Sequence, residues 1–166
     1  MASGGATSGA VARWVGGAGA LLGAWGLFEA SWVRFRELEL PVPGLPDELD
    51  GLRIVHLSDF HFGVPSPGIG AAWQAAVWAR ERRPDLVAVT GDLLTHPRGE
   101  LMLRRLVRVL PQPTIAVLGN HDLAISRDPQ AKRSDLRELE PATLLRDTGV
   151  ELELRGKRVW VAGVHP

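Results

Sequence analysis

Three short polar motifs in the sequence combine residue types that can bind divalent metal ions. They read Asp59-Phe60-His61, Gly91-Asp92 and Gly119-Asn120-His121-Asp122, at intervals of about 30 residues. The chain has no cysteine, so a metal would have to be held by histidine, carboxylate, amide or backbone oxygen. Such ligands favour Mn, Fe, Zn or Mg over soft metals. Each motif alone is more typical of a polar turn, whereas the three in this order are far more specific.

Each motif ends a continuous apolar segment that is typical of a buried strand. We expect strands at 52–59, 85–92 and 114–122, with helices at 69–83 and 100–110 between them. This alternation predicts an α/β fold with a parallel sheet covered on both faces. The carboxyl ends of parallel strands share one edge, so the three motifs should meet there. Asp59 and His61, two residues apart, can then face the same ion.

The remaining local signals concern glycines and the C-terminal third of the chain. Gly91 and Gly119 would let the backbone turn sharply and approach an ion closely. Residues 141–148 are expected to be helical, because Pro141 opens the segment and Gly149 follows it. Residues 150–164 are expected to form two short strands that turn at Arg155-Gly156.

The three motifs, taken together, resemble the D-x-H, G-D and G-N-H-[DE] signatures of the calcineurin-like metallophosphoesterase superfamily. The resemblance covers roughly residues 52–164. It implies the first half of an α/β/β/α sandwich and two divalent metal ions (Mn, Fe or Zn), with ligands Asp59, His61, Asp92 and Asn120. Asp92 would bridge both ions, and a metal-bridging hydroxide would attack phosphorus. His121 would stabilise charge or donate a proton to the leaving oxygen, with Asp122 orienting its ring.

The stretch 28–63 and the apolar run before it resemble a narrower group, the membrane-associated bacterial branch similar to the YaeI and YkuE phosphodiesterases. This resemblance implies hydrolysis of a phosphodiester or diphosphate bond. The phosphoester substrate would be lipid-like, either a lipid-linked molecule or a nucleotide-sugar lipid such as UDP-diacylglucosamine.

The N-terminal region contains an uncharged apolar run at 14–28 that is rich in small residues and tryptophan. Its length is below the roughly 20 residues that cross a bilayer core without tilt. We expect residues 1–36 to form an apolar helix that serves as a membrane anchor or uncleaved signal, followed by a Pro-rich linker at 37–51 and the phosphoesterase-like domain at 52–166. A cleavable signal and a helix packed on the domain are the alternatives. The flanking charges leave the membrane side open.

Charge bears on the class of substrate. The 19 Lys and Arg residues balance the 19 Asp and Glu residues, giving a net charge of 0. A nuclease is therefore the weaker interpretation, and no nucleic acid partner is expected. The oligomeric state is not determined by these patterns.

Two further signatures of the superfamily, a lone histidine and G-H-x-H, have no counterpart after His121, where His165 is the only histidine. We therefore expect these 166 residues to be an incomplete member of the superfamily that retains metal weakly. The alternative to an enzyme is a catalytically inert, membrane-associated module.

Overall fold

The computed structural model describes residues 17, 23–26 and 32–166. The chain divides into two compact units, Met1–Arg34 and Phe35–Pro166. The expected N-terminal apolar helix falls largely outside the described residues. Among those that are described, no helix is both long and apolar enough to cross a membrane.

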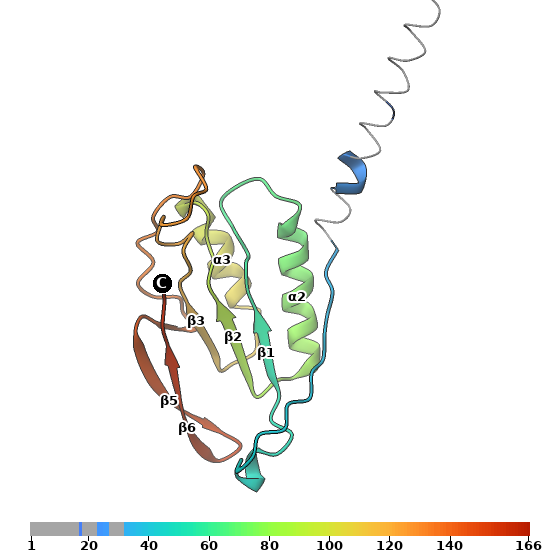
Figure 1. Cartoon of the computed structure of the whole chain (residues 1–166), viewed down its shortest axis with the longest axis vertical. Coiled ribbons are helices and arrows are strands. Elements are labelled where there is room, and N and C mark those ends of the chain that lie inside the picture. Colours follow the sequence, from blue (N-terminus) through green and yellow to red (C-terminus); the bar gives the residue numbers. More distant parts are fainter. Residues whose placement is uncertain (1–16, 18–22, 27–31) are drawn as a thin grey trace, which may run out of the picture. The chain divides into compact units, whose positions relative to one another are not determined.

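The second unit is built on a four-stranded parallel sheet (Figure 1). Its strands are β1 (Ile54–Leu57), β2 (Leu86–Thr90), β3 (Thr114–Val117) and β4 (Thr143–Leu145), in the order β1-β2-β3-β4. Leu57 pairs with Val89, and Thr90 pairs with Val117, so the first three strands finish at one edge. The sequence prediction of these three strands is confirmed.

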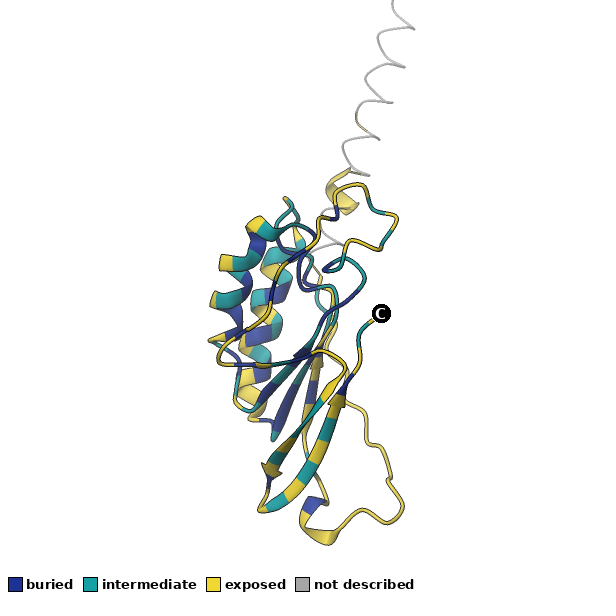
Figure 2. Cartoon of the chain, turned by 90° about the vertical axis from the view of Figure 1, so that its left-hand side faces the viewer, coloured by how far each residue is buried: buried dark blue, intermediate teal, exposed yellow. Residues whose placement is uncertain are grey.

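Helices α2 (Gly68–Arg82) and α3 (Glu100–Val107) cover one face of the sheet, and their buried sides turn toward it (Figure 2). Both helices were expected from the sequence. Alternate residues of the strands, such as Val55, Val87 and Ala116, form a core with alanines of α2 and aliphatic residues of α3. Helix α2 ends at a left-handed Arg83, next to Pro84, which cannot donate a helical hydrogen bond.

The opposite face of the sheet carries a hairpin of β5 (Thr148–Leu154) and β6 (Lys157–Gly163), as the sequence predicted. Leu152, Leu154 and Val159 of the hairpin pack with Leu86 and Ile115 of the sheet. The hairpin covers only part of this face: the side chains of β1 that point away from the helices remain exposed. The expectation of a sheet covered on both faces is therefore met on the helical side and only partly on the other.

The predicted helix at residues 141–148 is wrong. This segment contains β4, whose residues pair in parallel with β3, Ala116 opposite Leu144 and Val117 opposite Leu145. A helix of eight residues is marginal by itself, whereas pairing with β3 supplies backbone partners and buries Leu145. Pro141 and Gly149 bracket the segment but do not determine its conformation.

The predicted linker at 37–51 packs against the domain at both of its ends. Glu37 forms an ion pair with Arg82 of α2 at 3.1 Å, and the ring of Phe35 just before it stacks on Trp78 with centroids 4.6 Å apart. A short 3-10 helix, η1 (Asp47–Leu49), buries Leu49 under the hairpin.

Candidate metal centre

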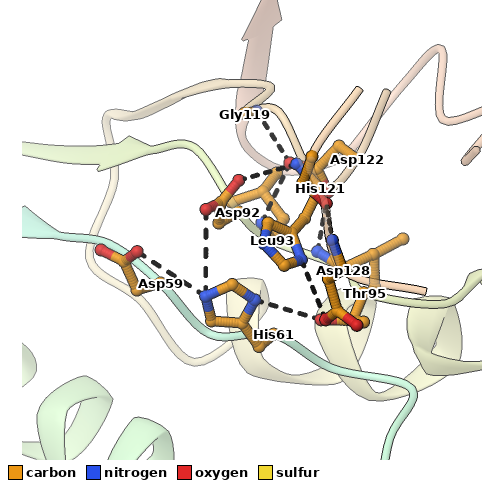
Figure 3. Close-up of polar contacts among 11 residues, drawn as sticks. Asp59, His61, Asp92, Leu93, Thr95, Gly119, His121, Asp122 and Asp128 are labelled. Carbon is orange, nitrogen blue, oxygen red and sulfur yellow. Dashed lines mark hydrogen bonds and ion pairs between the residues drawn. The ribbon is translucent and has the colours of Figure 1, made fainter. Parts of the chain in front are cut away.

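The three polar motifs lie together in the loops that leave β1, β2 and β3 (Figure 3). The loop after β1 continues alongside the loop after β2, because the amide of Asp59 donates to the carbonyl of Gly91 and the amide of His61 donates to that of Asp92. Phe62 extends this pairing by donating to Leu93. The parallel register therefore persists past the ends of the strands and places the motifs side by side.

His61, Asp92 and His121 form a group whose potential metal-binding atoms all lie within 4.8 Å of one another. His61 Nε2 lies 3.9 Å from Asp92 Oδ2 and 3.7 Å from Asp59 Oδ1. The rings of His61 and His121 meet edge to face, with centroids 4.5 Å apart. The two distances from His61 Nε2 to the carboxylates are longer than hydrogen bonds. They suit side chains that share an ion about 2 Å from each ligand atom.

The donor set fits a divalent metal ion. Histidine nitrogen and carboxylate oxygen are ligands for Mn, Fe and Zn. The Nδ1 atom of His121 is buried and has no hydrogen-bond partner among the described residues. A buried nitrogen without a partner raises the free energy of the folded protein, and a group that binds this nitrogen would remove that cost.

The backbone at the site adopts conformations that are unusual for residues other than glycine. Asp59, His61 and Asp92 have φ angles of 61°, 49° and 52°. Each such left-handed residue costs on the order of 1 kcal/mol and persists only where the surrounding structure imposes it. Three of them among the candidate ligands are consistent with a functional site.

The two glycines have distinct roles. Gly91 has a φ angle of 74°, which suits a sharp turn ahead of Asp92. Gly119 permits a close approach, since a Cβ atom added there would lie 2.3 Å from both the backbone nitrogen and Oδ1 of Asp92. The close neighbour of Gly119 is thus the Asp92 loop, which it allows to meet the loop after β3.

A family model described as "Calcineurin-like phosphoesterase" matches residues 52–161. The chain belongs to this family. Family members normally bind divalent metals and act on phosphoesters. A "Transmembrane protein with metallophosphoesterase domain" from Danio rerio is 39% identical over 75 residues, which are 45% of this chain and 17% of that protein. The matched part of this chain therefore spans less than a fifth of that relative.

Asp122, which was expected to orient the His121 ring, directs its hydrogen bonds to the backbone. Its carboxylate is fully buried and accepts hydrogen bonds from the amides of Leu93 (3.0 Å), Leu94 (2.7 Å) and Gly119 (2.8 Å). Asp122 thereby ties the loop after β3 to the loop after β2. Burial raises the pKa of Asp122, and the nearby charge of Asp92 adds to this effect, while the three amides oppose it.

Two residues near the ring nitrogens were not foreseen from the sequence. Asp128 is the carboxylate beside His121, with Oδ2 3.7 Å from Nδ1. Thr95 places its hydroxyl oxygen 3.1 Å from Nδ1 of His61. Neither residue belongs to a recognisable motif. The only available signal was the position of Thr95, three residues after Asp92.

The other expected site residues lie at the margin of the group. The Asp59 side chain is 64% exposed, at the open side of His61. Asn120 is half-buried between Gly119 and His121, and its backbone carbonyl accepts from the amide of Ile125. His165 lies beside Asp147, with Nε2 3.7 Å from Oδ2. It is outside the metal-competent group, which consists of His61, Asp92 and His121.

Proposed function

We propose that this domain hydrolyses phosphodiester or diphosphate bonds with the help of divalent metal ions. The observation that carries the proposal is the convergence of His61, Asp92 and His121 at the ends of three parallel strands, with ligand atoms within 4.8 Å. Asp59 and Asn120 lie next to this group in sequence and would extend the donor set to a second ion. Membership of the calcineurin-like family supports the same chemistry.

The residues of the site would divide the work of the reaction. Bound divalent ions would polarise the phosphoryl oxygens and lower the pKa of a water molecule. Asp92 is suited to the central position, because its Oδ1 accepts from the His121 amide at 3.0 Å while its Oδ2 faces His61. His121 would stabilise charge on the departing oxygen or donate a proton to it. Asp122 would hold the loops that carry both residues.

We further propose a lipid-linked or small diphosphate substrate, such as UDP-diacylglucosamine, and attachment of the chain to a membrane. The apolar run at 14–28 supports this, as does the relative that is named a transmembrane protein. The net charge of 0 gives no general attraction for a nucleic acid backbone.

Hydrolysis of bis(p-nitrophenyl) phosphate by the purified full chain, with and without added Mn²⁺, tests the proposed reaction. We expect metal-dependent hydrolysis that Asp92→Asn abolishes. Asp85→Asn is the matched control, because Asp85 lies at the opposite end of β2, where it binds Arg155. Hydrolysis that does not depend on added metal, or that is retained in Asp92→Asn, would contradict the proposal. Metal binding without hydrolysis would favour an inert module.

A further inference from the structure

Thr95 is a buried residue with a fixed place beside the candidate metal centre. Its exposure is 2%, and its hydroxyl oxygen lies 3.1 Å from Nδ1 of His61. Both of its backbone groups are used: its amide donates to Phe62 at 2.9 Å, and its carbonyl accepts from the amide of Lys132 at 2.8 Å. Hydrogen bonds of the Thr95 backbone to Phe62 and Lys132 therefore hold its hydroxyl next to the imidazole.

The opposite nitrogen of the same ring faces the carboxylates. His61 Nε2 lies 3.7 Å from Asp59 and 3.9 Å from Asp92, in the region that the metal-competent group surrounds. A neutral imidazole has one nitrogen with a hydrogen and one without, and only the latter can bind a metal. If Nδ1 carries the hydrogen and donates it to Thr95, then Nε2 is left free to bind an ion.

We propose that Thr95 is a positioning residue that fixes the tautomer and the ring orientation of His61 for metal binding. This inference rests on the proposed metal-dependent function. A ligating histidine generally donates its second ring hydrogen to a partner that orients it, and carboxylates, carbonyls or water are the usual partners. Here a threonine hydroxyl takes that place. His121 differs, because its buried Nδ1 has no hydrogen-bond partner among the described residues.

Two substitutions separate the hydroxyl from the shape of the side chain. Thr95→Val keeps the branched shape and removes the hydroxyl, and Thr95→Ser keeps the hydroxyl. We expect Thr95→Val to weaken Mn²⁺ binding, measured by isothermal titration calorimetry of the full chain, by about 10-fold or more. Thr95→Ser should restore most of the affinity. In the metal-free protein, the ¹⁵N shifts of the His61 ring should show hydrogen on Nδ1 in the wild type and a tautomer mixture in Thr95→Val.

Thr114→Val is the matched control for the loss of a buried hydroxyl. Thr114 is 1% exposed, and its hydroxyl donates to the carbonyl of Pro111 at 2.6 Å, at the start of β3 and away from the site. This variant should lose stability without losing metal affinity. A similar fall in affinity in Thr95→Val and Thr114→Val would overturn the proposal, and so would a His61 ring with its hydrogen on Nε2 in the wild type.

The two measurements also separate this inference from the proposed function. If the wild type binds no metal but its spectrum shows the Nδ1 tautomer, and Thr95→Val abolishes it, then the ring is positioned by Thr95 and the metal function fails. If metal binds tightly and Thr95→Val changes neither the affinity nor the tautomer, then the metal function stands and the role of Thr95 fails. Should Thr95→Val not fold, the wild-type tautomer and the affinity of Thr95→Ser decide.

Discussion

Asp92 and Asp122 are both carboxylates just beyond the ends of strands, yet their surroundings give them different roles. Asp92 keeps one oxygen directed at His61, 3.9 Å from its Nε2 atom. Asp122 is buried and uses its two oxygens on three backbone amides. The first carboxylate is suited to bind an ion, and the second is suited to hold together the loops that carry the ligands.

Asp122→Asn tests the structural role of this carboxylate. An amide can accept through only one oxygen and would turn its NH₂ group toward a backbone N–H. We expect a loss of about 2–4 kcal/mol in the free energy of unfolding, measured by urea denaturation. Asp128→Asn, at the partly exposed carboxylate beside His121, should change stability by no more than about 0.5 kcal/mol. Equal stability of both variants and the wild type would argue for Asp122 as a residue that acts only on the His121 ring.

Gly119→Ala should disrupt the site because the new methyl group would lie 2.3 Å from the backbone of Asp92. We expect a loss of about 2 kcal/mol or more in stability, from overpacking of the two loops, together with weaker Mn²⁺ binding. Gly70→Ala is the matched control, since that position in α2 has nothing within 4 Å of an added Cβ. It should stabilise the protein by up to about 1 kcal/mol. Retention of full Mn²⁺ affinity in Gly119→Ala would contradict the described approach of the loops.

The sequence predicts that the three polar motifs meet, because each follows an apolar strand of a parallel sheet. His61, Asp92 and His121 could be brought together on that ground alone. Thr95 and Asp128 could not, because their contacts depend on the course of irregular loops. The ligand roles of Asp59, His61, Asp92 and Asn120 stay predictions, as does the catalytic role of His121.

At the scale of elements, Arg155 fixes the hairpin to the sheet. Its guanidinium donates to both oxygens of Asp85, each at 3.0 Å, and also to the carbonyls of Asp50 and Gly51. Asp85 in addition accepts from the amide of Arg53 at 2.8 Å. Arg155, in the β5–β6 turn, thus joins the linker to the entry of β2. Asp85 in turn joins the entry of β1, at the end of the sheet away from the metal centre.

This contact predicts a dependence of stability on pH. Hydrogen bonds from Arg155 hold the pKa of Asp85 below its usual value of 3.8. The stabilisation is therefore fully present above pH 3.8 and is lost as the pH falls through the lower pKa of the folded state. At neutral pH, Asp85→Asn should cost about 1–2 kcal/mol in the free energy of unfolding. The difference between the two proteins should shrink in acid, and a difference that is constant down to pH 2 would contradict the assignment.

The elements differ in how far the sequence predicts them. The segment 86–90 is a run of apolar and β-branched residues, and only a buried strand accommodates it between two helices. The segment 143–145 is short and carries no such signal, so Pro141 and Gly149 suggested a helix instead. Its strand conformation depends on the free edge of β3, which lies 26 residues earlier at the end of that strand.

At the scale of the whole domain, the two faces of the sheet are covered unequally. Helices α2 and α3 bury one face, while on the other the hairpin leaves Ile54, His56 and Thr90 exposed. His56 and Thr90 contact each other across β1 and β2. Parallel sheets are normally covered on both faces, so this open surface is the least protected part of the described core.

A pair of neighbouring substitutions tests which face is open. Ile54 is 55% exposed and Val55 is 7% exposed, and the two side chains point to opposite faces of β1. Ile54→Thr should change the free energy of unfolding by no more than about 0.5 kcal/mol. Val55→Thr should cost about 1–3 kcal/mol, because it buries a hydroxyl in the apolar core. Equal costs for the two variants would mean that the Ile54 face is covered in solution.

The central claim is that loops from three strands form one metal centre. The most direct test adds sub-stoichiometric Mn²⁺ to the full chain and follows the ring signals of its five histidines by NMR. The structure predicts that the paramagnetic ion broadens the His61 and His121 signals most strongly. It also predicts that Asp92→Asn removes the effect. Earlier broadening of His165 or His56, or unchanged broadening in Asp92→Asn, would contradict the account.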